Sequence, residues 1–142
     1  MRGLVYSRPG YGQSTPRKPH EKWGVDFMHQ QADDVLPALL KKLHIHQPWL
    51  FGHSDGGSIA LLYAAHFPDQ LAGAIVLAPH IMVEDISLTS IQAAGVAYEE
   101  QGLRERLARH HQDSDSAFYG WNTIWLDPAF KAWNITNELS SI

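Results

Sequence analysis

The sequence predicts an α/β protein in which three parallel strands with flanking helices are followed by a helical segment. Three short apolar runs, at residues 4–6, 49–51 and 72–78, have the composition of buried strands. Helical patterns lie between these runs, and such alternation is typical of a parallel sheet. After the third run only helical patterns follow. We therefore expect a core over residues 1–81 and a separate helical layer over residues 82–142.

The expected helices follow from the spacing of apolar residues. These recur at helical intervals from residue 27 to 43, where Pro37 should either kink the helix or begin a new turn. Residues 7–25 are rich in proline and glycine and are expected to form a loop. The remaining expected helices cover residues 58–67, 87–101, 103–111 and 116–126.

Composition and charge argue against several classes of protein and binding site. The net charge is −4 and no basic face is visible, so nucleic-acid binding is not expected. The chain has no cysteine, which excludes disulfides and thiolate metal sites. No apolar run approaches the roughly 18 residues of a membrane span, and no signal peptide is apparent at the start. We expect a cytoplasmic protein that binds no membrane, metal or cofactor.

The pattern Gly52-His53-Ser54-Asp55-Gly56 fits G-x-S-x-G, the nucleophile elbow. It follows an apolar strand candidate and precedes a helix, which is the setting the motif requires. At such a turn the serine backbone is strained, and glycines at positions 52 and 56 would avoid clashes. The backbone N–H of Asp55 would then point at a developing oxyanion. The competing interpretation is a glycine-rich turn with Ser54 as the helix N-cap.

These segments resemble the central part of an α/β-hydrolase fold protein. Residues 6–14 resemble the segment after the family's strand four, although Ser7 stands where an aspartate is usual. Residues 51–57 resemble strand five with its elbow, residues 74–79 resemble strand six, and the later helices resemble the cap. The resemblance implies Ser54 as the catalytic nucleophile and the Asp55 N–H as an oxyanion donor.

The chain matches only about half of the family's pattern. In the family an oxyanion loop after strand three precedes the serine, and the catalytic acid and histidine follow strands seven and eight. The resemblance therefore implies that none of the histidines at positions 80, 110 and 111 forms a triad with Ser54. We expect the 142-residue chain by itself to be nearly inactive. Strand three has no counterpart here, so the sheet should have open edges and the chain could associate with itself.

Other residues have both a functional and a structural interpretation. His80 follows the third apolar run and could line the site from the end of a strand, or serve structure alone. Trp121 and Trp125 belong to an aromatic group that could line a substrate pocket or pack the helical layer. His110 and His111 are most simply interpreted as solvated residues at the end of a helix. The pair at positions 44 and 46 is a weak metal pattern, and no metal site is expected.

The sequence leaves two candidate functions open. The first is a serine hydrolase acting on an apolar or aromatic-derived carbonyl substrate: an ester, a lactone or the C–C bond of an oxo-dienoate. Serine at position 54 disfavours alkyl halides and epoxides, which relatives with aspartate at the elbow attack. The second is a truncated, catalytically silent fragment or a binding remnant.

Overall fold

The computed structural model describes residues 2–142, which divide into two compact units. The sheet unit comprises residues 25–83 and 132–142, and the helical unit comprises residues 2–24 and 84–131. The boundary near residue 83 lies close to the one expected from the sequence. However, residues 1–81 do not form one unit, because the first 24 residues group with the later helices.

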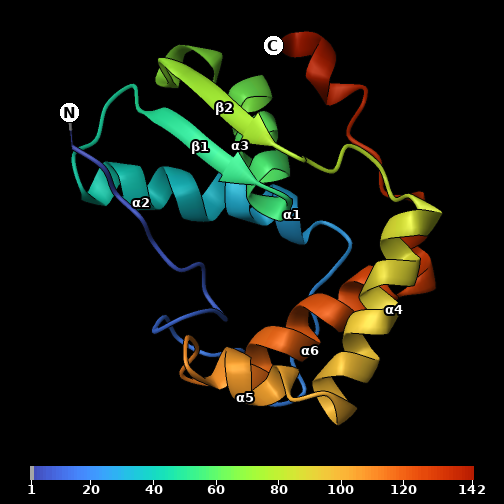
Figure 1. Cartoon of the computed structure of the whole chain (residues 1–142). Helices are drawn as coiled ribbons and strands as arrows, with labels where there is room; N and C mark the ends of the chain where they lie inside the picture. The colour runs from blue at the N-terminus through green and yellow to red at the C-terminus, as the bar shows by residue number, and fades with distance from the viewer. Residues whose placement is uncertain (1) are drawn as a thin grey trace. The chain divides into compact units, whose positions relative to one another are not determined.

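The sheet unit contains two strands and the helices around them (Figure 1). Its elements in chain order are α1 (Phe27–Gln30), the π-helix η1 (Gln31–Val35), α2 (Leu36–Lys42), β1 (Trp49–His53), α3 (Asp55–His66), the 3-10 turn η2 (Pro68–Gln70), β2 (Gly73–Leu77) and the 3-10 turn η4 (Glu138–Ser141).

The sheet has two strands where the sequence predicted three. β1 and β2 pair in parallel, from Trp49 opposite Gly73 to His53 opposite Leu77. The expected first strand at residues 4–6 is not formed, and Val5 is 98% exposed. A strand needs a neighbour for its backbone N–H and C=O groups. No described segment pairs with residues 4–6, so their apolar composition alone does not make a strand.

One face of this sheet is covered and the other is exposed. α3 contacts both strands, and its residues are apolar and buried along most of its length. The side chains at alternate positions face the other way: Trp49 and Phe51 on β1 are 67% and 70% exposed, and Ile75 and Leu77 on β2 are 49% and 48% exposed. These four residues form the open sheet face.

Pro37 alters the long helix that precedes the sheet. Residues 27–42 are continuously helical, but the five residues Gln31–Val35 form a π turn between α1 and α2. Proline has no N–H to donate to the carbonyl four residues earlier, and its ring crowds that carbonyl. A wider turn immediately upstream relieves this conflict. Of the two expectations for Pro37, the structure shows an altered turn within a continuous helical segment.

The final segment belongs to the sheet unit through backbone bonds. The N–H of Ile135 donates to the carbonyl of Ile81 at 2.8 Å, and Met82 forms an antiparallel bridge with Asn134. Ile135 is fully buried, and η4 contacts α3. Residues 132–142 therefore help to cover the central helix.

The helical unit is built from α4 (Asp85–Glu100), α5 (Leu103–Ala108), α6 (Ser114–Trp125) and the 3-10 turn η3 (Pro128–Ala132), which confirms the predicted helices of this region. Its core is aromatic. Tyr98 and Phe118 stack with ring centroids 3.9 Å apart, and Trp125 meets Phe130 edge-on at 5.1 Å. Among residues 2–142 no helix is long and apolar enough to cross a membrane.

His111 links the proline-rich loop to the end of α5. The N–H of Gly12 donates to His111 Nδ1 at 2.9 Å, and the N–H of Gln112 donates to the carbonyl of Gly12 at 2.8 Å. Burial, together with the neighbouring charge of His110, lowers the pKa of His111. The expectation of a solvated helix end is therefore wrong for His111, which is half-buried and accepts a hydrogen bond.

The stability of the helical unit should fall in mild acid because of this bond. A protonated Nδ1 cannot accept from Gly12, so the folded chain binds its proton less readily than the unfolded chain. The contribution is fully present above about pH 6.5, the ordinary pKa, and is lost as the pH falls through the lower folded pKa. The free energy of unfolding, measured with urea at a series of pH values across this range, should fall accordingly. His111→Asn keeps an acceptor without titrating, and an unchanged pH dependence in that variant would contradict the assignment.

Candidate active site

Ser54 occupies the strained turn that the glycine-rich motif predicts. Its φ of 54° and ψ of −126° lie outside the regions that L residues ordinarily adopt. β1 ends at the preceding residue and α3 begins at Asp55. Such a conformation costs about 1–3 kcal/mol and persists only where the surroundings enforce it. The predicted strand–turn–helix geometry around Ser54 is thereby confirmed.

The two motif glycines differ in how strictly the turn requires them. A Cβ on Gly52 would lie 2.2 Å from the carbonyl oxygen of Gly56 and 2.7 Å from the nitrogen of Gly57. A Cβ on Gly56 would meet nothing within 4 Å beyond its own helix. The expectation that both positions exclude a side chain is therefore wrong for Gly56. The backbone of α3 approaches Gly52 closely, and it is the strand residue that must lack a side chain.

The hydroxyl of Ser54 is directed at a histidine. Ser54 Oγ lies 3.1 Å from His80 Nε2. The side chain makes no capping bond to α3, so the interpretation of Ser54 as an N-cap is not supported. The expectation was that no histidine of the chain forms a triad with this serine; His80 reaches Ser54 Oγ, and the absence of a complete triad stays a prediction. The sequence left His80 either lining the site or serving structure alone, and the structure places it in hydrogen-bond contact with Ser54.

Two features after β2 bring His80 to Ser54. Ala78 has a φ of 45°, a left-handed conformation that turns the chain at the end of the strand. Pro79 then packs on the first turn of α3, where a Cβ on Gly57 would lie 3.1 Å from the proline Cβ. The N–H of Ser54 donates to the backbone carbonyl of Leu77 at 3.0 Å, so the hydrogen-bond ladder between β1 and β2 continues into the turn. Ser54 and His80 thus lie at the same end of the sheet.

Ser58 is a site residue that the motif did not indicate. Its hydroxyl donates to the backbone carbonyl of His80 at 2.6 Å and accepts from the backbone N–H of His80 at 3.0 Å. Ser58 is fully buried on α3, among apolar residues. A polar residue on the buried side of an otherwise apolar helix was the available signal for it.

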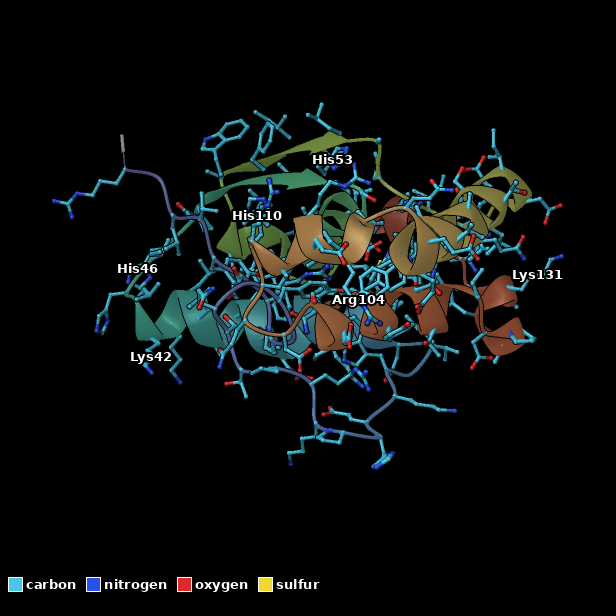
Figure 2. The ribbon with its side chains drawn as sticks, turned by 60° about the horizontal axis from the view of Figure 1, so that its bottom comes forward. Lys42, His46, His53, Arg104, His110 and Lys131 are labelled. Carbon is cyan, nitrogen blue, oxygen red and sulfur yellow. The ribbon has the colours of Figure 1, made fainter. Side chains whose placement is uncertain are left out.

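The neighbours of Ser54 in the motif point elsewhere. His53 lies at the end of β1 with an exposed side chain (Figure 2). Asp55 is 6% exposed and occupies the first position of α3, where a negative charge complements the helix dipole. Within residues 2–142 no group of three or more histidine and acidic side chains is arranged to hold a metal ion.

The two tryptophans predicted to contact substrate lie in the helical unit. Trp125 is 1% exposed and packs against Phe130, so its ring belongs to the core of the helical unit, and a substrate contact for it stays a prediction. Helical spacing gives a core ring and a pocket-lining ring the same pattern. Trp121 is half-buried with its ring 5.9 Å from that of Phe118, and its role in binding stays a prediction.

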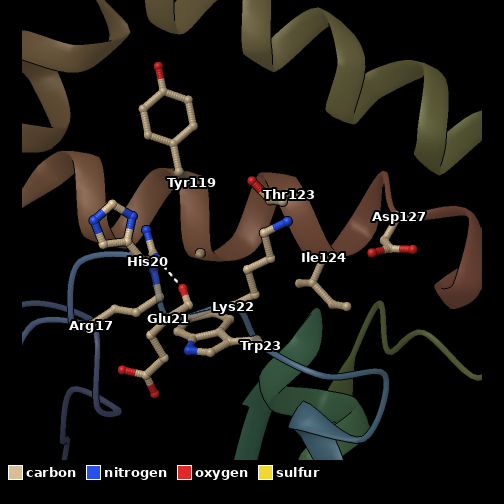
Figure 3. Close-up of a pocket in the computed structure, with 10 residues that line it drawn as sticks. Arg17, His20, Glu21, Lys22, Trp23, Tyr119, Thr123, Ile124 and Asp127 are labelled. Atoms are coloured by element: carbon tan, nitrogen blue, oxygen red, sulfur yellow. Dashed lines mark hydrogen bonds between the residues drawn. The ribbon is translucent and has the colours of Figure 1, made fainter.

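The helical unit also contains a pocket of about 140 Å³ between the proline-rich loop and α6 (Figure 3). Trp23 and Tyr119 provide aromatic surface, while Lys22 and Asp127 provide opposite charges. The Arg17 side chain donates to the carbonyl of Glu21 at its rim. The pocket contains no residue of the Ser54 site.

Comparison with known proteins places these features in one family. The alpha/beta hydrolase fold family matches residues 1–129. Human serine hydrolase BPHL is 34% identical over 82 residues, covering 58% of this chain and 27% of that protein. The bifunctional esterase/perhydrolase DCH of Acinetobacter calcoaceticus is 29% identical over 131 residues, covering 86% of this chain and 44% of that protein. Human monoglyceride lipase is 32% identical over 92 residues, covering 63% of this chain and 29% of that protein. The chain thus spans less than half the length of these relatives.

Proposed function

Because this chain belongs to the α/β-hydrolase fold family, we propose that it carries the nucleophile of a serine hydrolase and that Ser54 is this nucleophile. One observation carries the proposal. Ser54 is held at a φ of 54° on a strand–helix turn, and its Oγ faces His80 Nε2 at 3.1 Å instead of capping α3. Strain of this kind lowers the stability of the fold, so a structural role does not explain it. The same conformation exposes the hydroxyl for reaction.

The proposed reaction begins with attack of Ser54 Oγ on a substrate carbonyl carbon. The electron pair of the C=O double bond moves to the oxygen, where the N–H of Asp55 and the N-terminal end of α3 would stabilise the charge. The tetrahedral intermediate expels the leaving group, which takes up the proton that the Ser54 hydroxyl has lost, and an acyl group remains on Ser54. Water then releases the acid and restores the serine.

An ester is the first substrate class to test. Two relatives are named as an esterase and a lipase. A lactone or the C–C bond of an oxo-dienoate would be attacked through the same addition step. We further propose an apolar or aromatic-derived acyl group and a cytoplasmic location. The competing proposal, a catalytically silent fragment, is favoured by the short span of the chain relative to these proteins.

The test is pre-steady-state release of p-nitrophenol from p-nitrophenyl acetate. We expect a burst approaching one equivalent per chain, followed by slow turnover, because the chain spans less than half the length of the relatives it matches. Ser54→Ala should abolish the burst. Ser90→Ala is the matched control, since it removes a helix hydroxyl that bonds the carbonyl of Ile86 at 3.0 Å in the other unit. Equal bursts from the wild type and Ser54→Ala, or no burst from either, would refute the proposal.

A further inference from the structure

The pocket between the proline-rich loop and α6 combines a buried apolar lining with a charged rim (Figure 3). Gly120 and Ile124 are buried, whereas Lys22, Thr123 and Asp127 are exposed. The volume of about 140 Å³ is close to the roughly 150 Å³ of a cavity that binds benzene. The pocket is therefore large enough for one six-membered ring, with a polar substituent of that ring at the rim.

The aromatic wall of the pocket is fixed before any ligand binds. A Cβ on Gly10 would lie 2.8 Å from Trp23 Cζ2, and a Cβ on Gly120 would lie 3.2 Å from the same atom. The absence of side chains at these two positions gives the indole its place between the loop and α6. Tyr11 adds an aromatic contact, with ring centroids 5.4 Å apart. A wall that is already ordered adds little entropic cost to binding.

Hydrogen bonds also order the loop that carries the cations of the pocket. The N–H of Arg17 donates to the buried Ser116 Oγ at 2.7 Å, and the N–H of Lys18 donates to Glu21 Oε2 at 3.0 Å. The Arg17 side chain donates to the backbone carbonyl of Glu21. The loop is thus tied both to α6 and to itself, so it presents Lys22 to the pocket in a defined arrangement.

The charges that line the pocket favour an anion. The two acidic side chains already accept hydrogen bonds in their own turns: Glu21 from a loop N–H, and Asp127 from the N–H of Ala129 at 2.8 Å. Lys22 has no ion-pair partner within residues 2–142, and its side chain extends along α6 toward Thr123 (Figure 3). An ammonium group beside a hydroxyl can hold a carboxylate through charge-assisted hydrogen bonds.

We propose that this pocket is a binding site for a small aromatic carboxylate, with the ring against Trp23 and the carboxylate at Lys22. Benzoate is the simplest ligand of this class, and its single ring matches the volume of the pocket. The lining residues all belong to the helical unit and none belongs to the Ser54 site. The inference is therefore independent of the proposed hydrolase reaction.

The experiment is a titration of the isotopically labelled full chain with benzoate, followed by NMR through the backbone amide and indole N–H signals. Saturable shifts should concentrate at residues 17–23 and 119–127 and include the indole of Trp23. We expect a dissociation constant of about 1 mM or lower, an ordinary binding efficiency for a ligand of this size. The absence of saturable shifts at millimolar benzoate, or shifts centred elsewhere in the chain, would overturn the proposal.

Two comparisons test the selection for a carboxylate. Lys22→Gln should raise the dissociation constant about 3- to 5-fold, the range of an exposed ion pair. Lys18→Gln should leave it unchanged, because Lys18 is an exposed cation of the same loop that does not line the pocket. Benzylamine, similar in size and opposite in charge, should bind about 10-fold more weakly than benzoate. Equal losses in the two lysine variants, or equal binding of benzylamine, would contradict the assignment.

A last variant separates this pocket from the nucleophile. Ser54→Ala should bind benzoate as the wild type does, because the hydroxyl of Ser54 is not part of the pocket. Weaker binding in that variant would place benzoate at the Ser54 site and overturn the inference. A failure of the burst assay would refute the proposed function and leave the benzoate site untouched.

Discussion

Gly52→Ala should unfold the sheet unit, whereas Gly56→Ala should leave it folded and slightly stabilise it. The alanine Cβ at position 52 would lie 2.2 Å from the Gly56 carbonyl oxygen, which is a backbone atom that no rotamer change can move. We expect a loss of at least about 3 kcal/mol, the upper end of overpacking costs. At position 56 the Cβ enters open space, and alanine gains up to about 1 kcal/mol over glycine within a helix.

Urea unfolding followed by circular dichroism checks this pair of variants, which differ from each other only in which glycine carries the methyl group. The urea concentration at the midpoint of unfolding should fall sharply for Gly52→Ala and rise slightly for Gly56→Ala. Comparable destabilisation by both would mean that α3 does not approach β1 as the structure shows. Because the chain has two units, each transition should be assigned before it is converted to a free energy.

Trp49→Lys combined with Phe51→Lys should convert a self-associating chain into a monomer. The open sheet face presents Trp49, Phe51, Ile75 and Leu77 at 48–70% exposure on adjacent strands. Among residues 2–142, β1 and β2 pair only with each other, so each strand also has a free edge. Exposed apolar faces and free edges both favour pairing with a second chain, and lysine opposes both.

Light scattering during size-exclusion chromatography over a range of concentrations measures the effect. The wild-type mass should rise with concentration, and the double variant should stay at the monomer mass. Val5→Lys is the matched control, because Val5 is 98% exposed but belongs to the helical unit and to neither strand of the sheet. A wild type that remains monomeric at all concentrations would contradict self-association through this face.

The sequence was sufficient for those features that depend on local spacing. Apolar periodicity located the later helices, and the glycines around Ser54 predicted its strained turn. The strand at residues 4–6 could not be judged in this way, because a strand exists only with a partner. The same limit applies to Trp125, since periodicity shows which rings face inward but not whether they meet a neighbour or a ligand.

The contact between Ser54 and His80 depends on features that no short motif contains. His80 reaches the serine because Ala78 adopts a positive φ and because Ser58, on another element, binds the His80 backbone. Alanine rarely adopts a positive φ, so nothing in the sequence indicates one at position 78. The partner of a buried hydroxyl also cannot be deduced from its position in a helix. The sequence therefore predicted His80 only as a residue that could line the site, and not its contact with the Ser54 hydroxyl.

The central claim, that Ser54 is the nucleophile, is tested most directly by locating a covalent adduct. The chain is treated with diisopropyl fluorophosphate, digested, and examined by tandem mass spectrometry. The account predicts one diisopropylphosphoryl group per chain, on Ser54, and none in Ser54→Ala. Labelling at another residue, or equal labelling of the two proteins, would contradict it.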